Sequence, residues 1–197
     1  ALGSTLLTAG ALTPLETSAQ TSAGPAPAVV GQVHWTYKKV GSESVKLFMW
    51  NKKLAKPSAG GATAPKGTIV FVHGSSMAST PVFDLQVSGR DDSSLMDWFA
   101  RQGYDTWCFD CEGYGRSDKT RNVNANVACG ADDMAAVSEY IMKLNGGKKL
   151  LAYGASSGAL RTALFAQKHP ERIARMVLDA MVWTLSLIHI SEPTRPY

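Results

Sequence analysis

The residues best suited to do chemistry in this sequence lie in the pentapeptide GASSG, residues 154–158. A short apolar run, residues 150–153, precedes it, and a small-residue, helix-forming run follows it. This pattern predicts a strand, a sharp turn and a helix, with the hydroxyl of Ser156 pushed out of the sheet on a strained turn. A hydroxyl held in this way can attack a carbonyl carbon. The alternative interpretation is an ordinary Gly/Ser turn between a strand and a helix.

The neighbours of Ser156 have separate predicted roles. Gly154 and Gly158 flank it because side chains at these positions would collide with the neighbouring strand and helix. A helix that begins at Ser157 offers free backbone N–H groups and the positive end of its dipole. These groups would stabilise negative charge developing on an oxygen beside Ser156.

The elements that must position this turn alternate along the chain. A strand buried on both faces is expected at residues 68–72, and further strands at 104–110, 149–153 and 173–178. Helices are expected at 91–102, at 131–144 and from about 157. Residues 32–40 and 45–50 alternate in polarity around a Gly-Ser-Glu turn, which predicts an antiparallel hairpin. We therefore expect an α/β fold with a mostly parallel sheet, an N-terminal antiparallel hairpin and helices on both faces.

Side-chain spacing assigns the residues of each element to its faces. The first hairpin strand places Val33, Trp35 and Tyr37 on one face, and His34, Thr36 and Lys38 on the other. The helix at 91–102 would bury Leu95, Trp98 and Phe99. The helix at 131–144 would bury a stripe made of Met134, Val137, Ile141 and Leu144.

Two further motifs follow predicted strands, and together with the GASSG turn they carry a family resemblance. The first is HGSS at residues 73–76, and the second is D-x-x-G-x-G-x-S, formed by Asp110, Gly113, Gly115 and Ser117. The three motifs, in this order, resemble the α/β-hydrolase family over roughly residues 32–183. The two-glycine loop lacks the third glycine of a Rossmann fingerprint, so dinucleotide binding is rejected.

The resemblance implies roles for individual residues. Ser156 would be the nucleophile, and the backbone N–H groups of Ser157 and Ser75 would form the oxyanion hole. His73 would be structural and, with Gly74, would shape the turn after its strand. Haloalkane dehalogenases and soluble epoxide hydrolases carry Asp at the nucleophile position, so those chemistries are disfavoured here.

A serine nucleophile needs a histidine base and a carboxylate, and in this fold both follow the nucleophile in the chain. His169 would lie roughly 20 Å away along the helix, at about 1.5 Å per residue. His189 lies in residues 185–197, which resemble an in-frame translation of a transposon adapter used in sequencing libraries. We therefore expect the native sequence to stop near Thr184, before the catalytic histidine. Asp179 is a candidate acid, or else an ordinary strand-end residue.

Three segments follow from this interpretation. Residues 1–28 resemble the remnant of a secretory signal, with a disordered linker as the alternative. Residues 29–184 form a partial α/β-hydrolase domain, and residues 185–197 are an adapter read-through. The first segment predicts export to the periplasm or outside the cell, with a cytoplasmic location as the alternative. The apolar part of residues 1–28 is too short and too weakly hydrophobic for a transmembrane helix.

The charge distribution and the cysteines narrow the function classes. The net charge is +4, and residues 29–66 hold seven lysines against one acid, which predicts a solvated basic face. Without an arginine cluster or a stacking platform, nucleic-acid binding is not expected. Cys108 lies in an apolar strand, so we expect it to be a core residue rather than part of a thioredoxin-like site. The sequence does not decide whether Cys111 and Cys129 form a disulfide. No metal cluster is visible and no cofactor is expected.

The sequence therefore supports a serine hydrolase that acts on a small-molecule ester, thioester or lactone through an acyl-enzyme. A cofactor-free haloperoxidase and a carbon–carbon bond hydrolase use the same triad and stay as alternatives. A non-catalytic, hydrolase-like binding protein is the alternative from another class. We expect the chain as written to be inactive, because no base lies within reach of Ser156. The oligomeric state is not predicted.

Overall fold

The computed structural model describes residues 28–55, 64–121 and 126–181. Almost all of the expected signal remnant and the whole of the expected adapter read-through lie outside these ranges. The strands are β1 (Val29–Val40), β2 (Glu43–Leu54), β3 (Thr68–Val72), β4 (Asp105–Phe109), β5 (Leu150–Ala155) and β6 (Ile173–Asp179). The helices are α1 (Ser79–Phe83), α2 (Leu95–Arg101), α3 (Val127–Leu144) and α4 (Ser157–Lys168).

The strands form one six-stranded sheet in the order β1-β2-β4-β3-β5-β6. The pairs β4–β3, β3–β5 and β5–β6 are parallel, whereas β2 is antiparallel to both β1 and β4. This arrangement confirms the expected fold class. The parallel strands β3 and β4 are buried almost throughout, in keeping with their continuous apolar runs.

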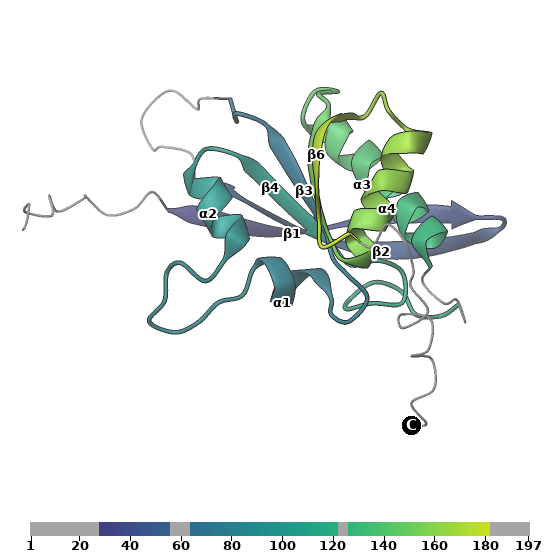
Figure 1. Cartoon of the computed structure of the whole chain (residues 1–197), viewed down its shortest axis with the longest axis horizontal. Helices are drawn as coiled ribbons and strands as arrows, with labels where there is room; N and C mark the ends of the chain where they lie inside the picture. The colour runs from purple at the N-terminus through teal and green to yellow at the C-terminus, as the bar shows by residue number, and fades with distance from the viewer. Residues whose placement is uncertain (1–27, 56–63, 122–125, 182–197) are drawn as a thin grey trace, which may run out of the picture.

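Helices cover both faces of the sheet (Figure 1). On one face, α3 and α4 pack over a core that includes Val70, Phe109, Met134 and Phe165. On the other face, α1 and α2 lie over a smaller cluster that includes Phe71, Phe83 and Met96. The carboxyl ends of the parallel strands therefore meet between these layers, at the edge where the predicted motifs lie.

Of the two hairpin faces, the structure buries the one that carries Lys38. Tyr37 is 57% exposed, and Val33 and Trp35 are also exposed, whereas Lys38 on the opposite face is only 6% exposed. Lys52 on β2 is buried as well. The prediction of a solvated lysine face is therefore wrong for these two lysines, because each of them is paired with two buried carboxylates.

Helix α2 differs from its prediction in its start and in its buried face. Ser94 caps the helix by accepting a hydrogen bond from the N–H of Asp97, so the helix begins at Leu95 rather than at residue 91. Trp98 is 52% exposed, and Met96 is buried in its place. The cause is Asp97, whose carboxylate turns inward to pair with Lys52 and rotates Trp98 toward solvent.

Helix α3 begins earlier than expected, and β6 lies at the sheet edge. Asn126 caps α3 by accepting from the N–H of Cys129, which adds a turn before residue 131. Leu144 is 58% exposed, although the rest of its predicted stripe is buried. On β6, Met176 and Val177 are 44% and 55% exposed, so the described part of the sheet ends in an apolar edge.

Candidate functional site

Ser156 lies between β5 and α4 in a strained backbone conformation. Its φ of 55° and ψ of −124° are rarely adopted by residues other than glycine. Two backbone hydrogen bonds hold the turn. The N–H of Ser156 donates to the carbonyl of Asp179 at 2.9 Å. The carbonyl of Ser156 accepts from the N–H of Ala159, also at 2.9 Å. Such strain persists only where the surroundings enforce it, and it is common at functional sites.

The flanking glycines explain how the turn is enforced. A Cβ atom added at Gly158 would lie 2.2 Å from the carbonyl oxygen of Val72, at the end of β3. One added at Gly154 would lie 2.5 Å from the carbonyl oxygen of Gly158. Backbone therefore packs directly on backbone at both positions, and the start of α4 is pressed against the end of β3.

The HGSS turn after β3 lies beside Ser156. A Cβ atom added at Gly74 would lie 3.6 Å from the Oγ of Ser156, so only this glycine separates the loop from the hydroxyl. The carbonyl of the next residue, Ser75, accepts from the hydroxyl of Tyr114 at 2.9 Å. Ser157 opens α4, where the first N–H groups of a helix lack partners within the helix. The two expected oxyanion donors therefore belong to segments that meet at Ser156.

His73 is fully buried, and both of its ring nitrogens have partners. Nε2 accepts from the N–H of Cys111 at 3.0 Å, so Nδ1 carries the proton and donates to the carbonyl of Gly74 at 2.6 Å. Burial lowers the pKa of His73, which keeps the ring neutral at physiological pH. This geometry suits a residue that fixes the turn rather than one that takes a proton from Ser156.

The D-x-x-G-x-G-x-S segment builds the loop after β4. The carboxylate of Asp110 accepts from the N–H of Ser79 at 2.8 Å and from the N–H of Arg116 at 2.9 Å. Gly113 and Gly115 have positive φ, and a Cβ at Gly115 would lie 2.0 Å from the Asp110 carboxylate. The motif thus closes a tight loop around a buried carboxylate.

The last residue of this motif ties the loop to the sheet. Ser117 donates its hydroxyl to the carbonyl of Asp110 at 2.5 Å and accepts from the N–H of Phe48 on β2 at 2.8 Å. Ser117 is only 3% exposed. It therefore joins β2 to the end of β4 from within the fold.

Asp179 ends β6 next to the nucleophile turn, but its carboxylate does not point to a histidine among the described residues. It accepts from the hydroxyl of Tyr153 at 2.6 Å. Burial, together with the hydrogen bond to Asp179 and the charge of that carboxylate, raises the pKa of Tyr153 to about 12. The structure brings the backbones of Ser156 and Asp179 together and leaves the carboxylate engaged with a tyrosine.

The histidines of the described residues are all engaged away from Ser156. His34 lies on β1, where its Nδ1 is 3.0 Å from the hydroxyl of Tyr140. His169 caps the far end of α4, where its ring packs against Phe165. His189 lies outside the described residues.

Arg161 is a residue near the site that sequence reasoning missed. It lies on α4, is 2% exposed, and donates from Nη1 to the carbonyl of His73 at 3.0 Å and to that of Gly74 at 3.4 Å. A Cβ at Gly130 of α3 would lie 2.4 Å from its Cδ, so this glycine makes room for it. Arg161 therefore links the nucleophile helix to the HGSS turn. An arginine five positions after the serine matches no motif, and only the fold reveals its role.

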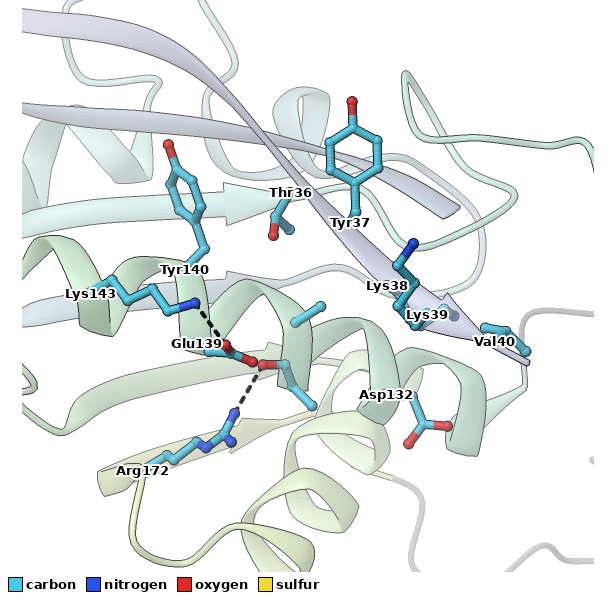
Figure 2. Close-up of a pocket in the computed structure, with 12 residues that line it drawn as sticks. Thr36, Tyr37, Lys38, Lys39, Val40, Asp132, Glu139, Tyr140, Lys143 and Arg172 are labelled. Carbon is cyan, nitrogen blue, oxygen red and sulfur yellow. Dashed lines mark hydrogen bonds and ion pairs between the residues drawn. The ribbon is translucent and has the colours of Figure 1, made fainter. Parts of the chain in front are cut away.

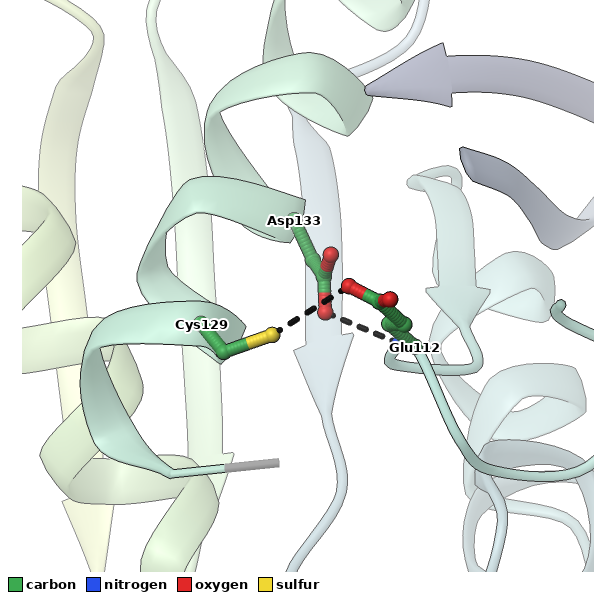
Figure 3. A group of neighbouring side chains, drawn as sticks. All are labelled: Glu112, Cys129 and Asp133. Atoms are coloured by element: carbon green, nitrogen blue, oxygen red, sulfur yellow. Dashed lines mark hydrogen bonds between the residues drawn. The ribbon is translucent and has the colours of Figure 1, made fainter. Parts of the chain in front are cut away.

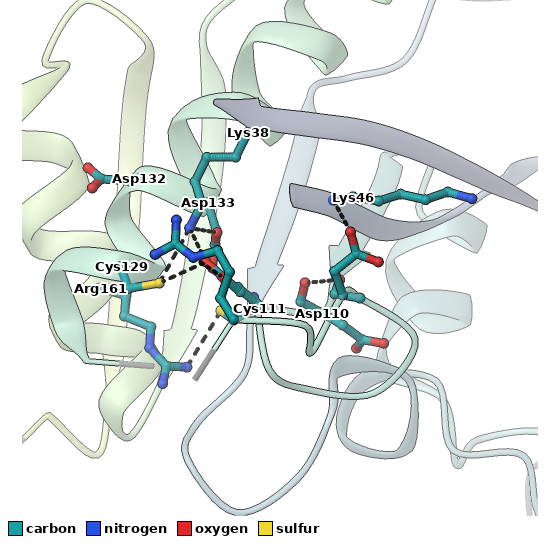
Figure 4. Close-up of polar contacts among 12 residues, drawn as sticks. Lys38, Lys46, Asp110, Cys111, Cys129, Asp132, Asp133 and Arg161 are labelled. Atoms are coloured by element: carbon teal, nitrogen blue, oxygen red, sulfur yellow. Dashed lines mark hydrogen bonds and ion pairs between the residues drawn. The ribbon is translucent and has the colours of Figure 1, made fainter. Parts of the chain in front are cut away.

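A buried charged cluster lies on the α3 side of the same loop (Figures 3 and 4). Glu112, Cys129 and Asp133 place potential metal-ligand atoms within 4.8 Å of one another. The ammonium of Lys38 already lies among them, at 2.8 Å from Glu112, 2.6 Å from Asp133 and 3.3 Å from the Sγ of Cys129. Burial opposes the charge on Lys38, but Asp133 and Glu112 outweigh it and raise its pKa. This cluster therefore holds a lysine where a cation would otherwise bind.

The three cysteines are free thiols in the structure. Cys108 and Cys111 are fully buried, and burial raises the pKa of Cys108 to about 12. Cys108 is a core residue of β4, as expected. Cys129 contacts Lys38 and Glu112 rather than Cys111.

Solved structures share this fold at low sequence identity. A predicted CIB-like hydrolase from Thermoplasma acidophilum is 19% identical over 80% of this chain and 67% of its own, with a TM-score of 0.52. A thermophilic esterase from Thermogutta terrifontis is 20% identical over 77% of this chain and 46% of its own, with a TM-score of 0.54. A probable hydrolytic enzyme from Pseudomonas aeruginosa is 18% identical over 83% and 46%, with a TM-score of 0.57. This chain thus spans about half to two thirds of the length of these proteins.

A family model described as "Serine aminopeptidase, S33" matches residues 63–188, which is well over half of the chain. None of the curated proteins matches it. No helix in the described residues is long and apolar enough to cross a membrane. The family match, the strand order and the three motifs together show that this chain belongs to the α/β-hydrolase family.

Proposed function

We propose that this protein is a serine hydrolase in which Ser156 attacks the carbonyl of an ester, thioester or lactone. The observation that carries the proposal is the strained backbone of Ser156 between β5 and α4, directly against Gly74. Ser156 is exposed, and the HGSS turn lies beside it, which supports the proposed role for the backbone N–H groups of Ser75 and Ser157. The hydrolase family membership supports a small-molecule substrate.

In the proposed reaction the Oγ of Ser156 forms a bond to the carbonyl carbon, and the carbonyl oxygen becomes negatively charged. The N–H groups of Ser75 and Ser157 donate to that oxygen, and the positive end of the α4 dipole adds to the stabilisation. Each such donor contributes ~3 kcal/mol to the transition state. Collapse of the intermediate releases the alcohol and leaves an acyl-enzyme, which water then hydrolyses.

The proton of Ser156 needs a base, and we propose that a histidine outside the described residues supplies it. His73 has both nitrogens engaged, and His34 and His169 lie elsewhere in the fold. Asp179 at the end of β6 is the proposed candidate for the carboxylate that orients this histidine. In that role it would exchange the hydrogen bond from Tyr153 for one from the imidazole.

Turnover of a p-nitrophenyl ester tests the proposal. We would compare the 197-residue chain with a longer product of its gene, extended beyond residue 184. The longer protein should turn over the ester, and Ser156→Ala should lower its rate at least about 10³-fold. Ser76→Ala is the matched control, because Ser76 is an exposed serine of the neighbouring turn and should leave the rate unchanged. A full rate in Ser156→Ala would contradict the proposal.

A non-catalytic binding protein is the second candidate, favoured by the engagement of the histidines in the described residues. The same experiment separates the two functions. If the longer protein neither turns over the ester nor differs from its Ser156→Ala variant, the binding function is supported. A cofactor-free haloperoxidase or a carbon–carbon bond hydrolase would instead require Ser156 but would act poorly on simple esters.

A further inference from the structure

A hollow lined by lysines lies at the end of the sheet opposite Ser156, and we call it the lysine hollow. Its volume is about 510 Å³, which is within the range of small-molecule pockets. Lys53 comes from β2, Lys66 precedes β3, and Lys148 and Lys149 precede β5. The six residues of β5 separate this hollow from Ser156, which is roughly 20 Å at about 3.3 Å per strand residue.

The four lysines of the hollow form no ion pair with an acid in the part of the chain that the structure describes. The lysines that do pair with carboxylates lie elsewhere: Lys38, Lys52, Lys143 and Lys168. Like charges around one concave surface focus the electrostatic potential and raise the local concentration of anions. The lysine hollow is therefore charged in a way that favours an anionic ligand.

The acid among the lining residues offsets only part of the lysine charge. Asp105 accepts from the Nδ2 of Asn51 at 2.6 Å on one oxygen and from the Nε1 of Trp107 at 2.9 Å on the other. Both carboxylate oxygens therefore accept hydrogen bonds from neutral donors, and neither is paired with a lysine of the hollow. The charge of Asp105 offsets one of the four lysine charges, so the hollow keeps a net positive charge of three.

The backbone that carries two of the lysines is fixed by Asn145, the C-cap of α3. Its side-chain oxygen accepts from the N–H of Lys148 at 3.0 Å, and its Nδ2 donates to the carbonyl of Lys148 at 3.1 Å. Gly146 and Gly147 supply the positive φ values of the intervening turn, +75° and +78°. A fixed backbone reduces the ordering cost when the ammonium groups close on a ligand.

A second hollow shows the contrast. Between β1 and α3 lies a hollow of about 580 Å³, lined by residues of both signs (Figure 2). There Glu139 pairs with Lys143 at 2.8 Å, and Arg172 donates to the carbonyl of Ala135 at 3.0 Å. Glu139, Lys143 and Arg172 thus have partners within the protein, whereas none of the four lysines of the lysine hollow is paired with an acid of the described residues.

We propose that the lysine hollow binds a small molecule carrying two or more phosphate groups. Lysine ammonium groups bind phosphate as point charges, and four of them exceed what one phosphate needs. The concave shape suits a compact phosphate-bearing group and fits a nucleic-acid duplex poorly. The inference does not depend on the function of Ser156.

Calorimetric titration of the 197-residue chain with inorganic tripolyphosphate tests the proposal. One saturable site is expected. The double variant Lys148→Ala/Lys149→Ala should weaken the affinity about tenfold or more, because it removes two of the four ammonium donors that would bind the phosphates. The double variant Lys39→Ala/Lys143→Ala changes the net charge equally and should bind as the parent does. Circular dichroism checks that all three proteins are folded.

Two further titrations separate the possible sources of the phosphate groups and test whether the site is specific for them. Vesicles containing a phosphatidylinositol bisphosphate would, if they bind through the same two lysines, assign the phosphates to a lipid headgroup and support the shared chemistry. Absence of saturable binding, equal weakening in both double variants, or binding of a short DNA duplex in place of tripolyphosphate would overturn it. Sodium sulfate at the same ionic strength should not displace the ligand, and full displacement would overturn it too.

Discussion

The nucleophile turn and the β1–β2 hairpin are held by different kinds of contact. At Ser156 backbone packs against backbone, since Gly154 and Gly158 leave no space for a Cβ atom. At the hairpin, Lys38 and Lys52 each lie between two buried carboxylates. The first kind of contact tolerates no added atom, and the second tolerates no lost charge. We therefore expect an added atom to destabilise the turn, and a lost charge to destabilise the hairpin.

The largest expected effect belongs to the hairpin. Lys38→Met should lower the free energy of unfolding by about 3–5 kcal/mol, because it leaves Glu112 and Asp133 buried without their cation. Lys52→Met should cost a similar amount. Lys39→Met is the matched control on the exposed face and should change stability by less than about 0.5 kcal/mol. Urea denaturation measures all three, and equal stability of Lys38→Met and Lys39→Met would show that the buried pairs do not hold the hairpin.

The nucleophile turn should respond to an added methyl group. Gly158→Ala should lower the free energy of unfolding by about 2–3 kcal/mol, since the new Cβ meets the backbone of β3. Gly146→Ala is the comparison, because Gly146 has a positive φ but no atom within 4 Å of its added Cβ. It should cost only the backbone strain of about 1 kcal/mol. If urea denaturation gives the same loss for both variants, the close packing at the turn is not a constraint.

Removing the backbone strain at Ser156 should raise the free energy of unfolding, by less than the Gly158→Ala substitution lowers it. Ser156→Gly should be more stable than Ser156→Ala by about 1 kcal/mol, because glycine adopts a φ of 55° without steric cost and alanine does not. Both variants lack the hydroxyl, so the difference between their unfolding midpoints reports the backbone alone. A less stable glycine variant would mean that the turn is not strained.

The smallest effect concerns pH at the end of β6. The raised pKa of Tyr153, about 12, means that its hydrogen bond to Asp179 contributes stability below pH 10, and that this contribution is lost as pH rises toward 12. Absorbance titration at alkaline pH should show one late-titrating tyrosine that Tyr153→Phe removes. Asp179→Asn should shift that titration to lower pH. An unchanged tyrosine titration in Tyr153→Phe would contradict this contact.

The two regions also differ in how far the sequence predicts them. The GASSG turn could be predicted because its determinants are contiguous, and glycine spacing reports local backbone packing. The Lys38 cluster could not, since Glu112 and Asp133 are distant in sequence and lysines at a hairpin usually face water.

The sequence predicted only those parts of the site whose positions follow from neighbouring residues or from the parallel strands. Ser156, Gly74 and Asp179 could be placed near one another because parallel strands bring their carboxyl ends to one edge. Arg161 was missed because its carbonyl partners on the HGSS turn exist only in the folded chain. Trp98 was misplaced because an inward aspartate overrode its apolar character. The roles of Ser156, Ser75, Ser157 and Asp179 stay predictions.

Covalent labelling with a fluorophosphonate probe tests whether Ser156 is the nucleophile. The longer product of the gene, incubated with the probe and digested, should yield one modified peptide, with the adduct on Ser156 by mass spectrometry. The 197-residue chain should label far more slowly, since the described residues hold no base beside that hydroxyl. An adduct on another residue, or equal labelling of a Ser156→Ala variant, would contradict the assignment of Ser156 as the nucleophile.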